Sequence, residues 1–180
     1  VALIMLSFWK SVTANQKSAW NYLFFAGIGL GMLAKGPIAL MLTFPPLFIW
    51  MVLHKEYKKV FRALPWLTGS LLAVLIAAPW YWMAEAKSPG FLNYFIIGEH
   101  FKRFFDSGWK GDLYGFPKQM PLGIIWLFLV AGTLPWIITV ICRAWKNRSQ
   151  ILKNRWVSFL FLWMLWTPLF FTVSKSLIHT

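Results

Sequence analysis

Apolar residues run along this chain in long blocks that are separated by short polar segments. The blocks expected to form helices are, in order, residues 1–9, 19–34, 38–53, 63–83, 119–142 and 156–173. Because a helix needs about 20 apolar residues to cross a bilayer, 63–83 and 119–142 are full-length spans, while 19–34 and 38–53 are slightly short. The pattern predicts an all-α fold, a polytopic transmembrane helical bundle in which residues 1–9 are the end of a span.

A single cation, Lys35, lies between the second and third apolar blocks. Lys35 lies there beside Gly36 and Pro37, which are suited to ending one helix and starting the next. A lysine between two apolar segments is costly unless it reaches water or pairs with an anion. Lys35 is therefore a candidate anion ligand, and the alternative is a lysine that merely extends to the membrane surface at the tip of a helical hairpin.

Composition supports a membrane protein. The chain is 59% hydrophobic and only 13% charged, whereas a soluble domain is about one quarter charged. The formal net charge of +13 comes from basic residues that flank apolar blocks, and no basic face with polar reading groups is evident, so we expect no nucleic-acid partner. The single cysteine, Cys142, is expected to pack as a small hydrophobic side chain. The chain begins inside an apolar block at Val1, and we expect it to be a fragment of a longer polytopic protein.

The basic residues also predict an orientation. The connections Lys10–Ser18, His54–Arg62 and Arg143–Arg155 together hold eleven Lys or Arg residues and a single carboxylate. Alternating spans would bring all three connections to one side of the membrane, and the bias of Lys and Arg toward the cytoplasm identifies that side. The opposite side then carries the Lys35 break and a long loop over residues 84–118.

That loop is the most unusual segment, because it holds four of the five carboxylates of the chain. We expect a helix over Phe91–Asp106 that lies in the membrane interface, with an aromatic side in the lipid and His100 on the opposite side. An imidazole there could ligate a metal ion or carry a proton. The alternative is a juxtamembrane anchor whose charges are only solvated.

Three segments together resemble a known family. They are "GLGMLAKGPIAL" (Gly29–Leu40), "APWYWMAEAKSPGFLNYFIIGEHFKRF" (Ala78–Phe104) and "SKSLIHT" (Ser174–Thr180), and they follow one another as in bacterial membrane glycosyltransferases of the GT-C group. That group includes aminoarabinose transferase, which modifies lipid A, and protein mannosyltransferases. The resemblance implies a multi-pass enzyme of the bacterial cytoplasmic (inner) membrane with a periplasmic active face. It also implies transfer of a sugar from a polyprenyl-phosphate carrier to a lipid, glycan or protein acceptor, without a nucleotide cofactor.

The resemblance assigns roles to individual residues. The carrier phosphate would be bound by Lys35, Arg103 and Lys175. A divalent metal ion, or the phosphate itself, would lie at His100, with Glu99 and Lys102 in support. The acidic catalytic base of such enzymes belongs to a first periplasmic loop that these 180 residues do not contain. The catalytic residue is therefore unknown within this chain, and the fragment alone is expected to be inactive.

Two other functions stay open on the sequence alone. Broken helices and membrane-embedded charges are also typical of a transporter or flippase for a lipid-linked or anionic substrate. A non-catalytic membrane subunit that binds anionic lipid would need only the aromatic side of the loop helix.

Overall fold

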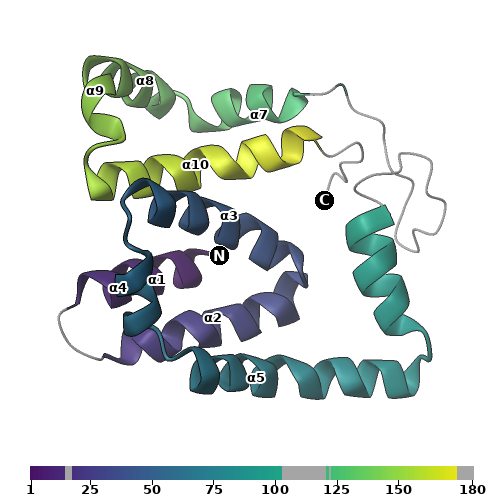
Figure 1. Cartoon of the computed structure of the whole chain (residues 1–180). Coiled ribbons are helices and arrows are strands. Elements are labelled where there is room, and N and C mark those ends of the chain that lie inside the picture. Colours follow the sequence, from purple (N-terminus) through teal and green to yellow (C-terminus); the bar gives the residue numbers. More distant parts are fainter. Residues whose placement is uncertain (15–17, 103–120, 122, 174–180) are drawn as a thin grey trace. The chain divides into compact units, whose positions relative to one another are not determined.

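The computed structural model describes residues 1–14, 18–102, 121 and 123–173 of the 180-residue chain. Every regular element within these ranges is a helix, which confirms the predicted all-α class (Figure 1). The chain forms two compact units, Val1–Ile97 and Gly98–Thr180. The first unit holds α1 (Ala2–Thr13), α2 (Ala19–Lys35), α3 (Ile38–Leu53), α4 (Tyr57–Ala63) and α5 (Trp66–Lys87), and a π-helix, η1 (Asn93–Lys102), begins in it.

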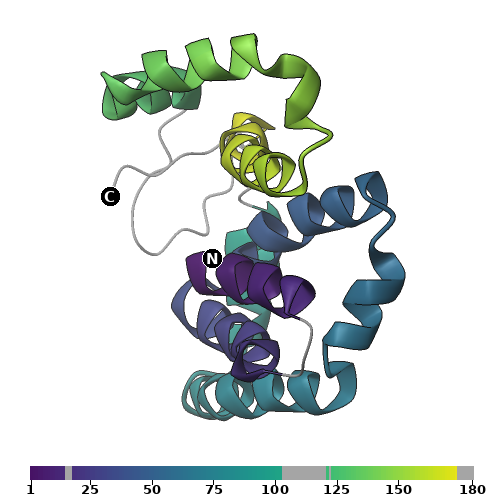
Figure 2. The ribbon, with the colours of Figure 1, turned by 90° about the vertical axis from the view of Figure 1, so that its left-hand side faces the viewer.

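The most extensive packing in the first unit joins α2 to α5 (Figures 1 and 2). Near the start of both helices, the hydroxyl groups of Tyr22 and Thr68 are 3.2 Å apart. Near their ends, the Tyr81 hydroxyl donates a hydrogen bond of 2.8 Å to the carbonyl oxygen of Met32. The two helices are therefore parallel, and the end of α2 lies at the same end of the unit as the end of α5.

Glycines allow these helices to approach closely. A Cβ atom on Gly29 would lie 2.8 Å from the Cβ of Ile76 and 2.9 Å from the carbonyl oxygen of Ala73, both on α5. On a neighbouring part of α2, a Cβ on Gly27 would lie 3.1 Å from the Ile4 side chain of α1. Small residues at helix contacts are the usual means of close packing in membrane proteins, where lipid competes equally for apolar surface.

Aromatic rings fill the opposite end of the first unit. The Phe8 ring of α1 packs against Phe24 of α2 and Trp50 of α3, with centroids 6.0 and 5.9 Å apart. Phe25 of α2 packs edge-on against Trp66 at the start of α5, at 5.8 Å. At this end the Asn21 side-chain amide also donates to the carbonyl oxygen of Ala63. The starts of α2 and α5 therefore lie at one end of the first unit, close to the end of α3.

The second unit contains α7 (Ile124–Thr133), α8 (Trp136–Lys146), α9 (Arg148–Ile151) and α10 (Arg155–Val173). Helix α7 packs on α10, and the Trp126 indole N–H donates a 2.8 Å hydrogen bond to the Thr172 hydroxyl. The start of α7 thus lies beside the end of α10, so these two helices are antiparallel. Asn154 begins α10, because its side-chain oxygen accepts hydrogen bonds from the backbone N–H groups of Trp156 and Val157.

The helix bounds agree with the sequence expectation at some places and differ at others. The break at Lys35 is found where it was predicted, between helices that end at Lys35 and begin at Ile38. The 119–142 block, expected as one span, instead contains two helices that meet at an angle of 104° next to Pro135. Among the described helices, α5 alone is long and apolar enough to cross a membrane unbroken, and the bent pair α7–α8 qualifies only if it counts as one span.

Candidate functional site

The candidate site is built around the end of α2. Lys35 is the last residue of this helix and is exposed. The next residue, Gly36, has φ 69°, a backbone conformation that side chains other than glycine rarely adopt. Pro37 then precedes α3, so the chain reverses within two residues of the lysine. The break therefore holds the Lys35 side chain at the tip of the α2–α3 hairpin.

Tyr81 fixes the position of this tip relative to α5. Its hydroxyl donates to the carbonyl oxygen of Met32, one of the carbonyl groups near the helix end. A phenol carries an apolar ring and one polar atom, so a partly buried tyrosine near a span end is expected to find such a partner. Tyr81 had no predicted role, although it lies in the "APWYW" segment, whose resemblance to the family was the available signal.

Glu85 organises the turn that follows α5. Its carboxylate accepts hydrogen bonds from the backbone N–H groups of Gly90 and Leu92, each 2.8 Å long. Gly90 has φ 90°, and hydrogen bonds to a carboxylate are among the stronger ones. Glu85 thus has a structural role in this turn.

Aromatic contacts connect this turn to the start of η1. The Phe91 ring stacks on Phe95 at 5.4 Å and meets Trp80 edge-on at 5.6 Å. Phe95 also lies 6.0 Å from the ring of Tyr81. The first turn of η1 therefore packs on the last turns of α5, at the same end of the first unit as Lys35.

The winding of η1 corrects one expectation. Residues 93–102 form a π-helix, in which each backbone N–H bonds to the carbonyl group five residues earlier, rather than the expected α-helix. The α-helical estimate of the side on which His100 lies therefore does not apply to η1. The α-helical prediction had placed His100 opposite the aromatic side. Glu99 and His100 are partly buried and Lys102 is exposed.

Two of the predicted phosphate ligands, Arg103 and Lys175, lie outside the described residues. For His100, the parts of the chain that the structure describes contain no group of three or more His, Cys, Asp or Glu residues able to hold a metal ion. Glu99 and His100 alone would supply two donors, fewer than the three protein ligands that a catalytic zinc site uses. The described residues therefore do not form a complete metal site.

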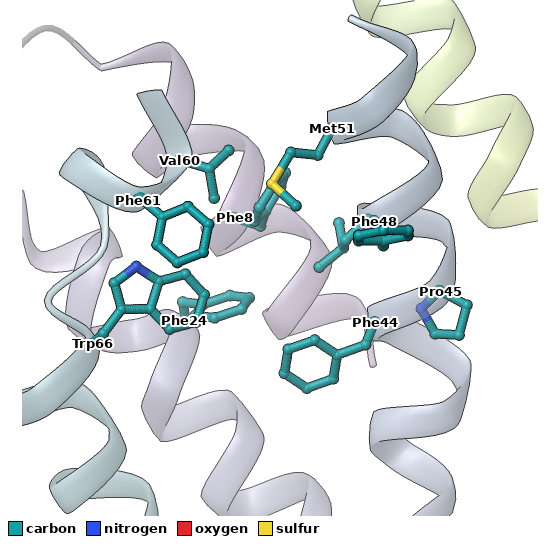
Figure 3. A pocket seen from close by; sticks show the side chains of 10 residues that line it. Phe8, Phe24, Phe44, Pro45, Phe48, Met51, Val60, Phe61 and Trp66 are labelled. Atoms are coloured by element: carbon teal, nitrogen blue, oxygen red, sulfur yellow. The ribbon is translucent and has the colours of Figure 1, made fainter. Parts of the chain in front are cut away.

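A hydrophobic pocket of the first unit lies elsewhere. A pocket of about 440 Å³ is lined by hydrophobic side chains of α1 to α5, among them Phe8, Phe44, Phe61 and Trp66 (Figure 3). It lies at the aromatic end of the unit, and Lys35 lies at the other end. A hollow without ionisable groups suits hydrocarbon and offers nothing to a phosphate group, so it is not the anion site.

Comparison with known proteins identifies relatives over the whole chain. An undecaprenyl phosphate-alpha-4-amino-4-deoxy-L-arabinose arabinosyl transferase of Erwinia tasmaniensis is 31% identical over 183 residues, which cover 98% of this chain and 31% of that protein. An arabinosyl transferase 2 of otherwise identical description from Sodalis glossinidius is 30% identical over 186 residues, which cover 100% of this chain and 32% of that protein. The chain thus spans about one third of the length of these relatives.

The fold has a solved counterpart. The crystal structure of ArnT from Cupriavidus metallidurans bound to undecaprenyl phosphate matches 97% of this chain with a TM-score of 0.78 and 20% sequence identity, over 31% of its own chain. In addition, the family model described as dolichyl-phosphate-mannose-protein mannosyltransferase matches residues 1–95, which is more than half of the chain and almost the whole first unit. On this match, the chain belongs to the dolichyl-phosphate-mannose-protein mannosyltransferase family.

Proposed function

We propose that this chain is a membrane-embedded part of an enzyme that transfers a sugar from a polyprenyl-phosphate carrier to a lipid acceptor at the periplasmic face of the bacterial inner membrane. Relatives named for an undecaprenyl-phosphate-linked aminoarabinose support both the carrier and the sugar-transfer reaction. The observation that carries the proposal is the parallel packing of α2 and α5, because it brings the Lys35 tip and the first turn of η1 to one end of the first unit.

The chemistry follows from the charges at that end. A polyprenyl phosphate must leave with the electron pair of its bond to the anomeric carbon, so negative charge develops on the phosphate oxygens. Lys35 would neutralise part of this charge, and the guanidinium of Arg103 would bind two oxygens at once. The acceptor oxygen would attack the anomeric carbon from the opposite face, which inverts its configuration. Lys175 belongs to the same proposal as a third cation.

The acceptor must lose a proton as it attacks, and we assign that step to a carboxylate outside these 180 residues. Glu85 is engaged by two backbone N–H groups and is therefore not a free base. A divalent metal ion at His100 is also part of this proposal. Glu99 and Lys102 would set the local charge around the imidazole.

The orientation proposed for the chain places residues 84–118 and the Lys35 tip in the periplasm, and the basic connections in the cytoplasm. A membrane-impermeant thiol reagent tests this in intact cells, with single cysteines introduced at Ser88 and Ser149 in a cysteine-free background of the full-length protein. Ser88 should react from outside, and Ser149 should react only after the membrane is opened. Labelling of both from the same side would contradict the topology.

Transfer itself is tested with the purified full-length protein in lipid nanodiscs. A polyprenyl-phosphate sugar is the donor, and product formation is measured by mass spectrometry. Arg103→Ala should lower turnover by on the order of a hundredfold or more, as expected for lost charge stabilisation. Lys58→Ala, an exposed cation at the other end of the first unit, is the control. Full turnover by Arg103→Ala would reject the proposed site, and transport of the intact donor without transfer would favour the flippase alternative.

A further inference from the structure

The second unit contains a bent pair of helices, α7 and α8, with apolar and cationic side chains on its surface. Helix α8 meets α7 at 104°, close to a right angle. If α7 runs along the bilayer normal, α8 lies nearly parallel to the plane of the membrane, because the two helix axes are close to perpendicular. Pro135 immediately precedes α8, where a proline suits the start of a helix.

One side of α8 presents large apolar side chains that the unit leaves uncovered. Ile138, Ile141 and Trp145 follow one another at spacings of three and four residues, so they form one stripe along the helix. Their exposed fractions are 56%, 57% and 73%. A stripe of this kind on a helix that lies flat is suited to sinking into the boundary between headgroups and acyl chains.

The other side of α8 is polar and cationic. Arg143 and Lys146 are three residues apart and exposed, and with Cys142 and Asn147 they line a hollow of about 500 Å³. The Arg148 guanidinium of α9 lies 5.5 Å from the ring centre of Trp145, so a third cation is held beside the apolar stripe. The segment 143–155 contains five Lys or Arg residues and no Asp or Glu.

We infer that the segment from α8 to α9, Trp136–Ile151, is a binding site for anionic phospholipid headgroups, formed by other residues than the sugar-transfer site; this segment is called the α8–α9 elbow below. The apolar stripe would hold the elbow at the level of the acyl chains, and Arg143 and Lys146 would bind the headgroup phosphate, with the Asn147 side chain as a neutral donor. Each basic residue near an anionic membrane surface favours binding, so two cations lining one hollow give a clear preference over zwitterionic lipid.

The charged residues of the hollow favour a lipid over a protein as its ligand. Interfaces between proteins are depleted of lysine at their centre, whereas this hollow has Lys146 in its lining. An uncovered apolar stripe next to a segment whose charged residues are all cationic instead matches an anionic leaflet, in which acyl chains lie beneath negatively charged headgroups. The elbow also follows an apolar helix directly, which holds it at membrane depth.

Lipid binding is tested by native mass spectrometry of the full-length protein in detergent, titrated with phosphatidylglycerol or phosphatidylcholine. The double variant Arg143→Gln/Lys146→Gln should lose about tenfold in phosphatidylglycerol affinity while phosphatidylcholine binding is unchanged. Lys58→Gln/Lys59→Gln, which removes the same charge from α4, should stay within about threefold of the unchanged protein. Equal losses in both double variants, or no loss in either, would overturn the site.

The position of α8 is tested independently with nitroxide spin labels in phosphatidylglycerol-containing nanodiscs. A label at Ile141→Cys should be accessible to oxygen, which concentrates in the acyl region, and one at Thr139→Cys on the polar side should be accessible to a water-soluble nickel complex. Acyl-chain accessibility at both positions would mean that α8 crosses the bilayer, and water accessibility at both would mean that it leaves the membrane. Either outcome would overturn the inference.

Discussion

The Tyr81 hydroxyl donates a 2.8 Å hydrogen bond to the Met32 carbonyl oxygen, three residues before Lys35. This bond connects the end of α2 to α5 at the proposed phosphate site. The Tyr22–Thr68 hydroxyl pair connects the same two helices near their other end. Substituting Tyr81 or Tyr22 therefore removes one hydrogen-bonding hydroxyl group from the α2–α5 contact, near the ends of the two helices or near their starts.

We predict that Tyr81→Phe lowers kcat/KM for the polyprenyl-linked donor about fivefold, mainly through KM, because one hydrogen bond contributes about 1 kcal/mol. Tyr22→Phe removes the same atom far from the site and should leave the KM for donor unchanged. Steady-state transfer assays on the full-length protein measure both. Equal effects of the two variants would show that Tyr81 acts only through the stability of the helix pair.

Lys35 is expected to act through its charge. Lys35→Gln should raise the inhibition constant of free polyprenyl phosphate roughly tenfold or more, because hydrogen bonds to charged groups are the stronger class, and Lys35→Arg should restore most of the affinity. Lys58→Gln provides the matched loss of an exposed lysine. An unchanged inhibition constant in Lys35→Gln would identify Lys35 as a lysine that only reaches the membrane surface.

Glu85 is expected to hold the turn after α5 in place. Glu85→Ala removes the acceptor for the N–H groups of Gly90 and Leu92, so amide exchange in a peptide covering residues 86–95 should accelerate on the order of tenfold. Lys87→Ala, an exposed residue of the same region, should leave exchange unchanged. Hydrogen exchange with mass spectrometry gives the rates, and equal protection in Glu85→Ala would contradict the structural role.

Close packing of α2 on α5 predicts a cost for Gly29→Ala. The added methyl group would lie 2.9 Å from the Ala73 carbonyl oxygen, which is backbone and cannot turn away, so we expect a loss of about 1–3 kcal/mol. Gly132→Ala on α7 meets nothing within 4 Å and should be neutral or stabilising by about 0.5–1 kcal/mol. Thermal unfolding of the purified full-length protein in detergent separates the two variants, and a neutral Gly29→Ala would mean that α2 and α5 pack less closely.

The predicted metal site at His100 is tested by measuring the metal content of the purified protein rather than its activity. If His100 ligates a divalent ion, the full-length protein should retain about one metal ion per molecule after desalting, and His100→Ala should lose it, because removing one of three or four ligands greatly weakens such a site. Inductively coupled plasma mass spectrometry identifies the ion and gives the number bound per protein molecule. His54→Ala is the control. Equal metal content in both variants would remove His100 from the list of ligands.

Sequence patterns predicted the first unit better than the second for a physical reason. The Lys35 break is marked by a charge, a glycine and a proline in succession, each of which acts locally, so its position could be read from the chain. The 119–142 block carries only Pro135 as a signal. Prolines at 45, 46, 79 and 168 lie inside helices without ending them, so a proline alone does not fix a 104° bend.

The π-helical winding of η1 and the role of Glu85 also escaped prediction. Both depend on contacts made after folding. The rings of Trp80 and Tyr81 receive Phe91 and Phe95 of the turn and of η1, and the Glu85 carboxylate reaches N–H groups five and seven residues further along. A periodicity of 100° per residue carries no information about such tertiary contacts, so the sequence pattern did not predict the π-helical winding of the segment that contains His100.

The short turn between α5 and η1 also limits how this protein can vary in length. Surface loops usually tolerate inserted residues. Here Glu85 is bonded to Gly90 and Leu92, and η1 begins at Asn93, so a single residue inserted after Ser88 would separate the carboxylate from its partners and rotate every side chain of η1 about its axis. Functional homologues should accordingly keep the number of residues between Glu85 and His100 constant while the identities of the intervening residues change.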